Sequence, residues 1–572
     1  MKLTSIEIKN FRGIKHSAVF FPLDSRIVCL IGPGDSGKTT LLKAIEWALW
    51  PSWSLIATDT DFFNCDTSSP IEITASITEL PKELLKEDKF GLYLRDLVKS
   101  ILGGDDEPTD NGMTILTIQL TIDDSLEPRW NVITNRTEPK QISQKDRRLL
   151  SFGVIGYNQD KDFHWGRSSI LQKYADSRYT LHNAFTQAMR SAVENTKLDV
   201  LDEVAPKMKS IGKEYGVGFQ GELHNRLLMQ NGTYSSTVGV FDEKVPFAQR
   251  GLGSKRLLSI GMNVNAFNDG TLVLVDEVET GLEPYRISTL INQFRAQYHK
   301  QGQLIMTTHS RSVVCECGVS ELCIVNNNAG ELFFNQLGME EELKDDVQGL
   351  IRGAPDSFLC KRIIVCEGKT EIGLLRAFDS YLYEKEKVHM AYHGVGTVLG
   401  GGGNNFFKLA KLLKKCGYDT CILIDSDILH EEKTKQEVEA FGIPVFSWEK
   451  GFSVEEQIFH DCFIETVEAL VQIAIEEKSY DHVLTKLNEC FQHNDKPYFI
   501  AEGSIKLRDT ITTNELTAIG TLAKGKKCEW FKRTDRGQRM GKVVFNDFDK
   551  LEDCGFKRTI QALQAWVTGH ES

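Results

Sequence analysis

The segment G-P-G-D-S-G-K-T at residues 32–39 constrains the fold more than any other feature. It lies between an apolar strand-like run, residues 26–31, and a helical run, residues 40–50. In this P-loop pattern, glycines let backbone N–H groups curl around phosphate oxygens, Lys38 reaches the β- and γ-phosphates, and the Thr39 hydroxyl ligates Mg²⁺. The pattern predicts an α/β nucleotide-binding domain. The residues expected around the nucleotide are Gly32, Gly34, Gly37, Lys38, Thr39 and Thr40.

A second apolar segment, residues 271–277, ends in the acid pair Asp276 and Glu277. An acid pair after a strand supplies the aspartate of the Mg²⁺ shell and a catalytic glutamate that polarises the attacking water. Another strand-like run, residues 303–308, leads into His309. The order of P-loop, acid pair and histidine resembles the nucleotide-binding heads of ABC-type ATPases, in which that histidine senses the γ-phosphate. The resemblance implies that ATP is bound and hydrolysed.

ABC-type heads also carry a signature segment shortly before the acid pair. The candidate is Q-R-G-L-G-S-K-R at residues 249–256, which opens a helix and departs from the transporter spelling L-S-G-G-Q. It is similar to the G-x-G-[ST] variant of RecF- and SMC-like heads, whose opening motif also matches I-K-N-F-R-G at residues 8–13. In those heads the arginine equivalent to Arg12 approaches the nucleotide. The signature caps the ATP of an opposite protomer, so at least a homodimer is expected. Its residues here are Gly251, Gly253 and Ser254.

The chain has no room for the long coiled coil of SMC proteins. Only about 210 residues separate Lys38 from Gly251, and they lack sustained heptads. A helical stretch at residues 179–215 is expected to be a short arm or dimerisation element, broken at Pro206. Gln159 is a candidate for the Q-loop glutamine.

The second half of the chain places carboxylates at the ends of two apolar runs. Glu367 follows residues 362–366, and Asp425 and Asp427 follow residues 421–424. Ligands of parallel α/β sheets gather at the edge where the strands end, and clustered carboxylates favour Mg²⁺ or Mn²⁺. The pattern therefore predicts a metal site for phosphodiester chemistry. The connecting segments are expected to form a helix over 370–385, a strand over 388–395, a glycine loop over 400–403 and a helix over 404–416.

With E-G-K-T-E at residues 367–371 placed upstream of D-S-D, this pattern resembles the TOPRIM domain of topoisomerases, primases and a class of nucleases. The resemblance implies that Glu367, Asp425 and Asp427 hold the metal. Glu371 falls where nuclease members often carry a further acid.

An ABC-type ATPase head followed by a TOPRIM domain resembles the overcoming-lysogenisation-defect (OLD) family of nucleases, which includes the Gabija nuclease subunit and some retron-associated effectors. The resemblance implies an ATP-regulated, Mg²⁺- or Mn²⁺-dependent DNA endonuclease or nickase that defends against phage. A companion subunit is a further expectation, either a reverse transcriptase with its noncoding RNA or a helicase. Two more site residues are sought on this basis. Glu455, with Glu456 as the alternative, would be the acid that opens a later helix; Lys532, with Lys542 as the alternative, would be a catalytic lysine that steadies the phosphate.

The expected fold is α/β throughout, with a RecF/SMC-like head and a TOPRIM domain that carries a helical C-terminal extension. The expected domain plan is an ATPase domain at residues 1–345 with a helical insertion at about 170–235, a linker at 346–360, and a TOPRIM domain at 361–572 with a helical insertion at about 455–530.

The composition of the chain limits the kinds of binding partner and the cellular compartment that we expect. The net charge of −13 argues against bulk coating of nucleic acid, yet residues 524–542 hold eight basic side chains and are a candidate phosphate-contacting surface. Thirteen scattered cysteines fit buried, reduced thiols, and the absence of a signal peptide or apolar span predicts a cytoplasmic protein without a membrane partner.

Other TOPRIM enzymes fit the sequence less well. A topoisomerase needs a DNA-gate domain with a nucleophilic tyrosine, for which the residues after 453 are too few, and no primase domains are found. The alternative from another class is a non-cleaving, ATP-dependent DNA clamp or sensor in which the TOPRIM domain is structural.

Overall fold

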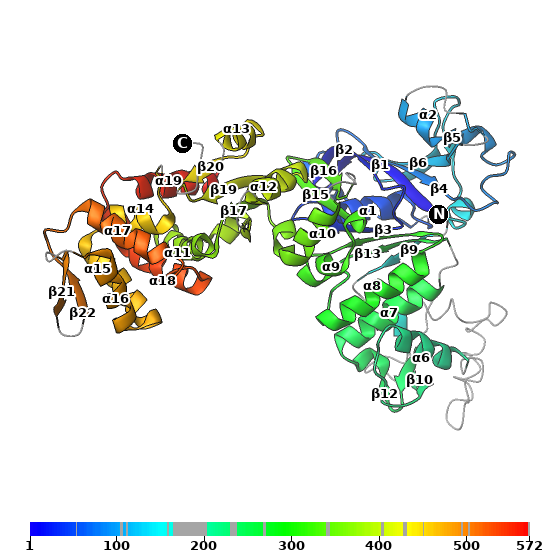
Figure 1. The fold of residues 1–572 in the computed structure, drawn as a ribbon. Helices are drawn as coiled ribbons and strands as arrows, with labels where there is room; N and C mark the ends of the chain where they lie inside the picture. The colour runs from blue at the N-terminus through cyan, green and yellow to red at the C-terminus, as the bar shows by residue number, and fades with distance from the viewer. Residues whose placement is uncertain are drawn as a thin grey trace. The chain divides into compact units, whose positions relative to one another are not determined.

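The structure is a computed structural model. It describes residues 1–52, 54–102, 107–109, 112–150, 152–156, 160–163, 203–228, 237–266, 270–338, 344–401, 405–426, 432–449, 451–492, 496–501 and 504–569. The chain divides into two compact units, Met1–Pro355 and Asp356–Ser572, each with its own core. Figure 1 labels their helices and strands. No described helix combines the length and the apolar character needed to cross a membrane.

The first unit begins with an antiparallel sheet in the strand order β2-β1-β4-β6-β7-β8, with β5 paired to β6. The alternation of apolar and polar residues along the N-terminal strand places Leu3, Ile6 and Ile8 in the core. The strands are β1 (Lys2–Phe11), β2 (Ile14–Phe20), β4 (Ile71–Thr78), β5 (Leu94–Asp96), β6 (Thr114–Ile122), β7 (Pro128–Val132) and β8 (Lys140–Gln141). The short helices α2 (Leu97–Leu102) and α3 (Gln144–Arg147) lie at its connections.

A second sheet, in the order β16-β15-β3-β14-β13-β9, carries the nucleotide motifs. Three of its four internal strands, β3, β14 and β13, are buried along their whole length, as parallel strands covered on both faces require. Helix α1 (Lys38–Ala48) packs between the two sheets in one apolar core. The strands are β3 (Ile27–Ile31), β9 (Phe152–Ile155), β13 (Leu272–Val275), β14 (Gln303–Thr307), β15 (Leu322–Asn328) and β16 (Glu331–Gln336). The helices after the insertion are α7 (Leu252–Ala266), α8 (Pro284–Tyr298), α9 (Arg311–Glu316) and α10 (Lys344–Gly353).

The expected helical insertion at 170–235 is only partly helical where the structure describes it. Helix α6 (Val204–Glu214) is followed by β10 (Leu223–Leu228), β11 (Thr237–Asp242) and β12 (Val245–Pro246), which form a small antiparallel sheet. Pro206 lies in the first turn of α6, where the N–H groups have no intrahelical acceptor, so α6 accommodates it. The expected break in the longer stretch falls on residues that the structure does not describe. Most of the expected helix at 179–215 lies outside the described residues.

The second unit contains a parallel sheet in the order β18-β17-β19-β20. One face packs on α12, and the other, with Ile364 and Leu423, faces the large helical core. The expected strand at 388–395 is wrong: residues Met390–His393 form a 3₁₀ turn, Gly394 has a φ of 70°, and the strand starts only after it. The elements are β17 (Arg362–Cys366), α11 (Lys369–Glu386), β18 (Val395–Leu399), α12 (Asn405–Lys415), β19 (Asp419–Ile424), α13 (Glu432–Ala440) and β20 (Val445–Ser447).

The helices α14 to α19 that follow in the chain complete the core of this unit, and Figure 1 shows α14, α15, α17 and α18 clustered beside α11. The expected helical insertion at 455–530 also contains an antiparallel hairpin, β21–β22. Helix α10 and a 3₁₀ segment, Pro355–Leu359, occupy the expected linker. The remaining elements are α14 (Val454–Asp461), α15 (Ile464–Lys478), α16 (Tyr480–Cys490), β21 (Tyr498–Ala501), β22 (Ser504–Leu507), α17 (Thr513–Lys524), α18 (Thr534–Asp547) and α19 (Gly555–Thr568).

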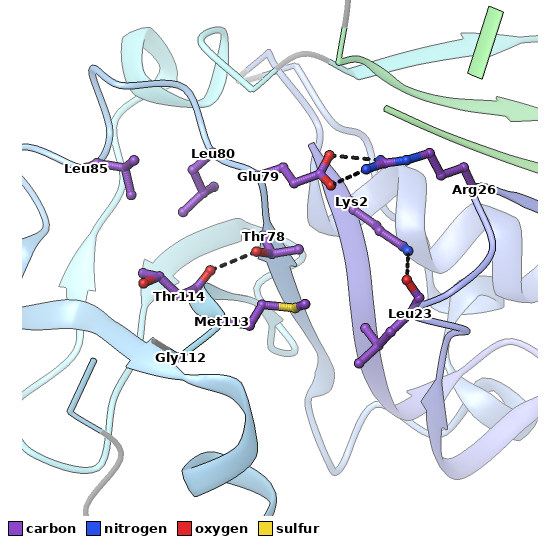
Figure 2. Close-up of a pocket in the computed structure, with 10 residues that line it drawn as sticks. All are labelled: Lys2, Leu23, Arg26, Thr78, Glu79, Leu80, Leu85, Gly112, Met113 and Thr114. Atoms are coloured by element: carbon purple, nitrogen blue, oxygen red, sulfur yellow. Dashed lines mark hydrogen bonds and ion pairs between the residues drawn. The ribbon is translucent and has the colours of Figure 1, made fainter. Parts of the chain in front are cut away.

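A cleft of about 640 Å³ lies along the first sheet, beside β1 and β4. Figure 2 shows Lys2 reaching the Leu23 carbonyl and the two-pronged ion pair between Arg26 and Glu79. These polar groups satisfy one another, and the described lining contains no P-loop or acid-pair residue.

Candidate functional sites

The backbone conformation of the P-loop requires glycine at two positions. Gly32 has a φ of 141°, and a Cβ there would lie 2.2 Å from the Val325 carbonyl oxygen; Gly37 has a φ of 89° and precedes α1. Gly34 faces open space, since a Cβ added there meets nothing within 4 Å. The loop therefore needs glycine for conformation at two positions and leaves room at the third, as a phosphate cradle requires.

Lys38 is buried within the loop. Its ammonium donates to the carbonyl oxygens of Gly32 (3.0 Å) and Pro33 (2.7 Å) and to the Ser36 hydroxyl (3.0 Å). Burial lowers the pKa of Lys38 to about 8, against the opposing field of Asp276. Thr40, two residues further on, is half-buried. The lysine is thus held where a phosphate in the loop would meet it.

Thr39 and Asp276 meet across the sheet edge, although 237 residues separate them. The Thr39 hydroxyl lies 3.2 Å from Asp276 Oδ1. Thr307, at the end of β14, donates to the same oxygen (2.6 Å) and accepts the Glu277 N–H (2.8 Å). Sequence reasoning missed Thr307, whose position directly before T-H-S was the available signal. The three residues place a hydroxyl and a carboxylate where a Mg²⁺ shell would need them.

His309 is exposed at the end of the same strand. Its backbone N–H donates to Glu279 Oε1 (2.7 Å), and the Thr308 hydroxyl donates to Glu279 Oε2 (2.8 Å). Glu279 was not predicted. It fixes the backbone of the histidine relative to the acid pair.

Arg12 and the signature segment have separate local partners. Arg12 has a φ of 50° and pairs with Asp61, with Nε 2.9 Å from Oδ1. Gly251 is exposed just before α7, whereas Gly253 is buried, and a Cβ on it would lie 2.5 Å from the Gly281 carbonyl oxygen. Ser254 Oγ is 3.5 Å from Arg286. Gln159 lies outside the described residues.

In the second unit, hydrogen bonds join the ends of β17 and β19 to the start of α14, and we call this carboxylate-bearing end of the sheet the acidic edge. Glu367 follows β17, and its Oε2 accepts the Asp425 N–H from the end of β19 (3.1 Å). Asp425 Oδ1 in turn accepts the N–H of Val454, the first residue of α14 (2.9 Å). The two strand ends and the start of α14, which carries Glu455, are thereby brought together. Asp427 lies outside the described residues.

Glu371 and Glu455 are buried at this edge, 3% and 2% exposed. Burial raises the pKa of Glu371 to about 8, and the fields of Glu455 and Glu367 add to the effect. Glu371 Oε2 is buried without a hydrogen bond. Within the described part of the chain no three His, Cys, Asp or Glu side chains are already arranged around a common ion position. A buried carboxylate oxygen without a donor, among other oxygen ligands, fits a hard divalent cation.

Glu456 is held in a structural role. It closes a capping box with Ser453, accepts from the Thr521 hydroxyl (2.7 Å) and forms an ion pair with Lys524 (2.6 Å). Burial alone would raise the pKa of Glu456, but these bonds outweigh it and lower the pKa. Of the two predicted helix-opening acids, only Glu455 is among the groups that raise the pKa of Glu371.

Lys532 is exposed, and the chain beside it is anchored to α11. The carbonyl of Phe531 accepts the Thr370 hydroxyl (3.3 Å). Helices α11 and α18 approach closely at glycines, because a Cβ on Gly373 would lie 2.5 Å from the Thr534 carbonyl and one on Gly537 would lie 2.7 Å from the Thr370 carbonyl. Both helices thus start at the acidic edge, with Lys532 just before α18. Lys542 is exposed two turns further along α18.

The predicted basic surface at 524–542 is partly neutralised by neighbouring acids. Four of its eight cations form ion pairs within the unit, which reduces the charge available to phosphates. Lys524 pairs with Glu456, Arg533 with Asp535, Arg536 with Glu477, and Arg539 with Glu476 and Glu477.

Two family profiles match the chain. Residues 27–316, just over half of the chain, match the family described as "AAA domain, putative AbiEii toxin, Type IV TA system". Residues 358–427 match "Overcoming lysogenization defect protein-like, TOPRIM domain". The chain belongs to this AAA-domain family and carries a TOPRIM domain of the OLD-like type. It is an enzyme that joins an ATPase domain to a TOPRIM nuclease domain, and the expected α/β fold class is confirmed.

Curated relatives and solved structures are similar to the chain to different extents. The OLD nuclease of Thermus scotoductus is 39% identical over 75 residues, 13% of this chain and only 14% of the relative. The Old nuclease of Escherichia phage P2 is 22% identical over 478 residues, 75% of this chain and 78% of the relative. An SMC head bound to the winged-helix domain of ScpA is 13% identical with a TM-score of 0.39, covering 60% of this chain and 100% of that one. The SMC head of Thermotoga maritima is 13% identical with a TM-score of 0.32, covering 59% and 99%.

Proposed function

We propose that this protein is an ATP-regulated DNA endonuclease or nickase that depends on Mg²⁺ or Mn²⁺. The observation that carries the proposal is the convergence of Glu367, Asp425, Glu371 and Glu455 at one edge of a parallel sheet, with a buried carboxylate oxygen of Glu371 lacking a donor. Buried carboxylates repel one another unless a cation or a proton neutralises them. A divalent cation does so and creates the chemistry of phosphodiester cleavage.

In this proposal Glu367, Asp425, Asp427 and Glu455 hold the metal, and Glu371 supplies a further oxygen. The bound cation would lower the pKa of a water and stabilise the leaving oxygen. Asp425 also fixes the start of α14 through its bond to Val454, so binding and positioning are coupled. Lys532, with Lys542 as the alternative, would neutralise charge that builds on the phosphate.

The ATPase site would control access to the nuclease site. Lys38 would bind the β- and γ-phosphates, Thr39 and Asp276 the Mg²⁺, and Glu277 would polarise the attacking water, with His309 and Arg12 near the nucleotide. The contact between Thr39 and Asp276 supports these roles. Gly251, Gly253 and Ser254 would cap the ATP of a second copy, which makes the active form at least a homodimer.

We further propose a role in defence against phage, in the manner of Gabija or retron-associated effectors. The words toxin and lysogenization in the matched family descriptions support this role. A reverse transcriptase with its noncoding RNA, or a helicase, would be the companion subunit. The alternative is a DNA clamp that closes with ATP and does not cut.

Plasmid nicking tests the proposal. Supercoiled DNA is incubated with Mg²⁺ or Mn²⁺, with and without ATP, and nicked and linear products are measured on gels. Glu367→Gln is expected to lower the cutting rate about a hundredfold or more, because metal stabilisation supplies several kcal/mol. Glu437→Gln, an exposed acid on α13, is the matched control and should cut like wild type. Lys38→Ala should abolish ATP turnover.

The outcomes separate the two candidate functions. Wild type that binds DNA in an ATP-dependent manner but never nicks it supports the clamp. A Glu367→Gln variant that cuts as well as wild type removes the metal assignment.

A further inference from the structure

Arg256 links the signature helix to the catalytic acid pair of the ATPase site. It lies in the second turn of α7, two residues after Ser254, and is 0% exposed. Its Nη1 donates to the Gly156 carbonyl (2.7 Å), just after β9. Its Nη2 donates to the Asp276 carbonyl (2.8 Å) and lies 3.4 Å from the Glu277 carbonyl, just after β13. One guanidinium therefore spans the ends of two adjacent parallel strands.

The backbone that Arg256 contacts adopts an unusual conformation. Glu277 has a φ of 43°, a region that residues other than glycine rarely adopt. The Glu277 N–H is held by Thr307 at 2.8 Å, and the carbonyls on both sides of that N–H face Arg256. The planar guanidinium of arginine holds several N–H donors in a fixed geometry and can bind carbonyl groups on two strands at once. The ammonium of lysine is a single compact charge on a flexible side chain.

Glu279 fixes the other end of the same loop. Its carboxylate accepts from the Thr308 hydroxyl and from the His309 N–H. The loop 276–279 is thus attached to α7 at its start and to the histidine strand at its end. Movement of α7 would be transmitted through Arg256 to the backbone of Glu277.

We infer that Arg256 is a positioning residue for ATP hydrolysis, which holds the Glu277 backbone in place and couples it to the signature segment on α7. The inference rests on the proposed catalytic role of Glu277 and goes beyond it, because it names the residue through which the signature acts on hydrolysis. It concerns the rate of hydrolysis more than the affinity for ATP, since Arg256 contacts backbone carbonyls rather than the P-loop.

A double-mutant cycle on the full-length protein tests this. Turnover of Mg²⁺–ATP and affinity for a fluorescent ATP analogue are measured for wild type, Arg256→Lys, Glu277→Gln and the double variant. We expect Arg256→Lys to lower kcat about ten- to hundredfold, as a displacement near 1 Å does, with analogue affinity within about twofold of wild type. In the Glu277→Gln background the same change should alter the residual rate by less than about twofold.

Arg147→Lys is the matched control. Arg147 is also buried, at 4% exposed, and it donates to the backbone carbonyls of Trp50, Ile142 and Ser52 outside the nucleotide motifs. It should lower the melting temperature as much as Arg256→Lys does while leaving kcat within about twofold of wild type.

Each outcome decides between specific assignments. Wild-type kcat in Arg256→Lys, or a loss that is as large in the Glu277→Gln background, overturns the positioning role. A Glu277→Gln variant with normal turnover instead removes the proposed catalytic glutamate. If Arg256→Lys does not fold, Glu279→Gln provides the same comparison from the other end of the loop, and an unchanged kcat there would refute the coupling.

Discussion

Replacing Glu371 by glutamine should stabilise the metal-free protein, and the gain should grow with pH. The carboxyl of Glu371 has an ordinary pKa of 4.5, which rises to about 8 in the folded chain, because burial and then the charges of Glu455 and Glu367 disfavour the ionised form. Between these two values the folded chain keeps a proton that the unfolded chain releases. The free energy of unfolding therefore falls as pH rises through this window, by about 1.4 kcal/mol per pH unit.

The size of the change in unfolding free energy follows from the pH range between the two pKa values. From pH 4.5 to pH 7 the full linkage is about 3 kcal/mol, and sharing of charge among the three acids reduces it to about 1–3 kcal/mol. Glutamine keeps the shape of the glutamate side chain, so the substitution removes the charge without changing the packed volume much. For a unit the size of Asp356–Ser572, about 1 kcal/mol moves the melting temperature by about 2–4 °C. A rise of about 2–12 °C at pH 8 is expected.

Calorimetry in EDTA at pH 5 and pH 8 measures it, with Glu437→Gln as the exposed-acid control. Glu371→Gln should melt well above wild type at pH 8 and close to it at pH 5. Adding Mn²⁺ should stabilise wild type more than the variant, which narrows the gap. The reasoning fails if Glu371→Gln melts at or below wild type at pH 8, or if the gain is equal at the two pH values.

Two further predictions concern the packing around the same edge. Glu456→Gln should lower the melting temperature, because it removes the partly buried charged partner of Lys524 at a cost of about 1–3 kcal/mol. Calorimetry at pH 7 measures this change. An unchanged melting temperature would contradict the structural role of Glu456. Gly537→Val should separate α18 from the Thr370 carbonyl and lower both stability and plasmid nicking, whereas Gly349→Val in α10, where an added Cβ meets nothing within 4 Å, should not affect nicking.

Local patterns were sufficient for most of the strands and helices that carry the sites. The P-loop predicts β3 and α1 because glycine conformation and strand-loop-helix order are local properties. The run before Glu367 predicts β17 in the same way. The strand expected at 388–395 failed because V-H-M-A-Y-H favours extended structure by residue type, whereas the left-handed Gly394 sets where the strand can start.

The partners of charged side chains could not be predicted, because they come from distant parts of the chain. Arg536 and Arg539 look available for phosphate in the sequence, yet Glu476 and Glu477 on α15 pair with them. For Glu456 a signal was present: Ser453 three residues earlier spells a capping box, which marks that glutamate as structural. Thr307 is an ordinary residue type; its position directly before T-H-S was the one local signal, and its bond to Asp276 shows its role.

The ATPase site and the proposed nuclease site both place carboxylates where parallel strands end. The negative charge of these carboxylates is balanced in different ways at the two sites. Asp276 is half-exposed and accepts from the Thr307 and Thr39 hydroxyls, so its charge is stabilised by the protein itself. Glu371 is buried, and the nearest charges oppose its ionisation. A divalent cation should therefore change the stability of the second unit far more than that of the first. Titrating Mn²⁺ at pH 8 while following the two melting transitions would show this difference, and equal shifts in both would contradict it.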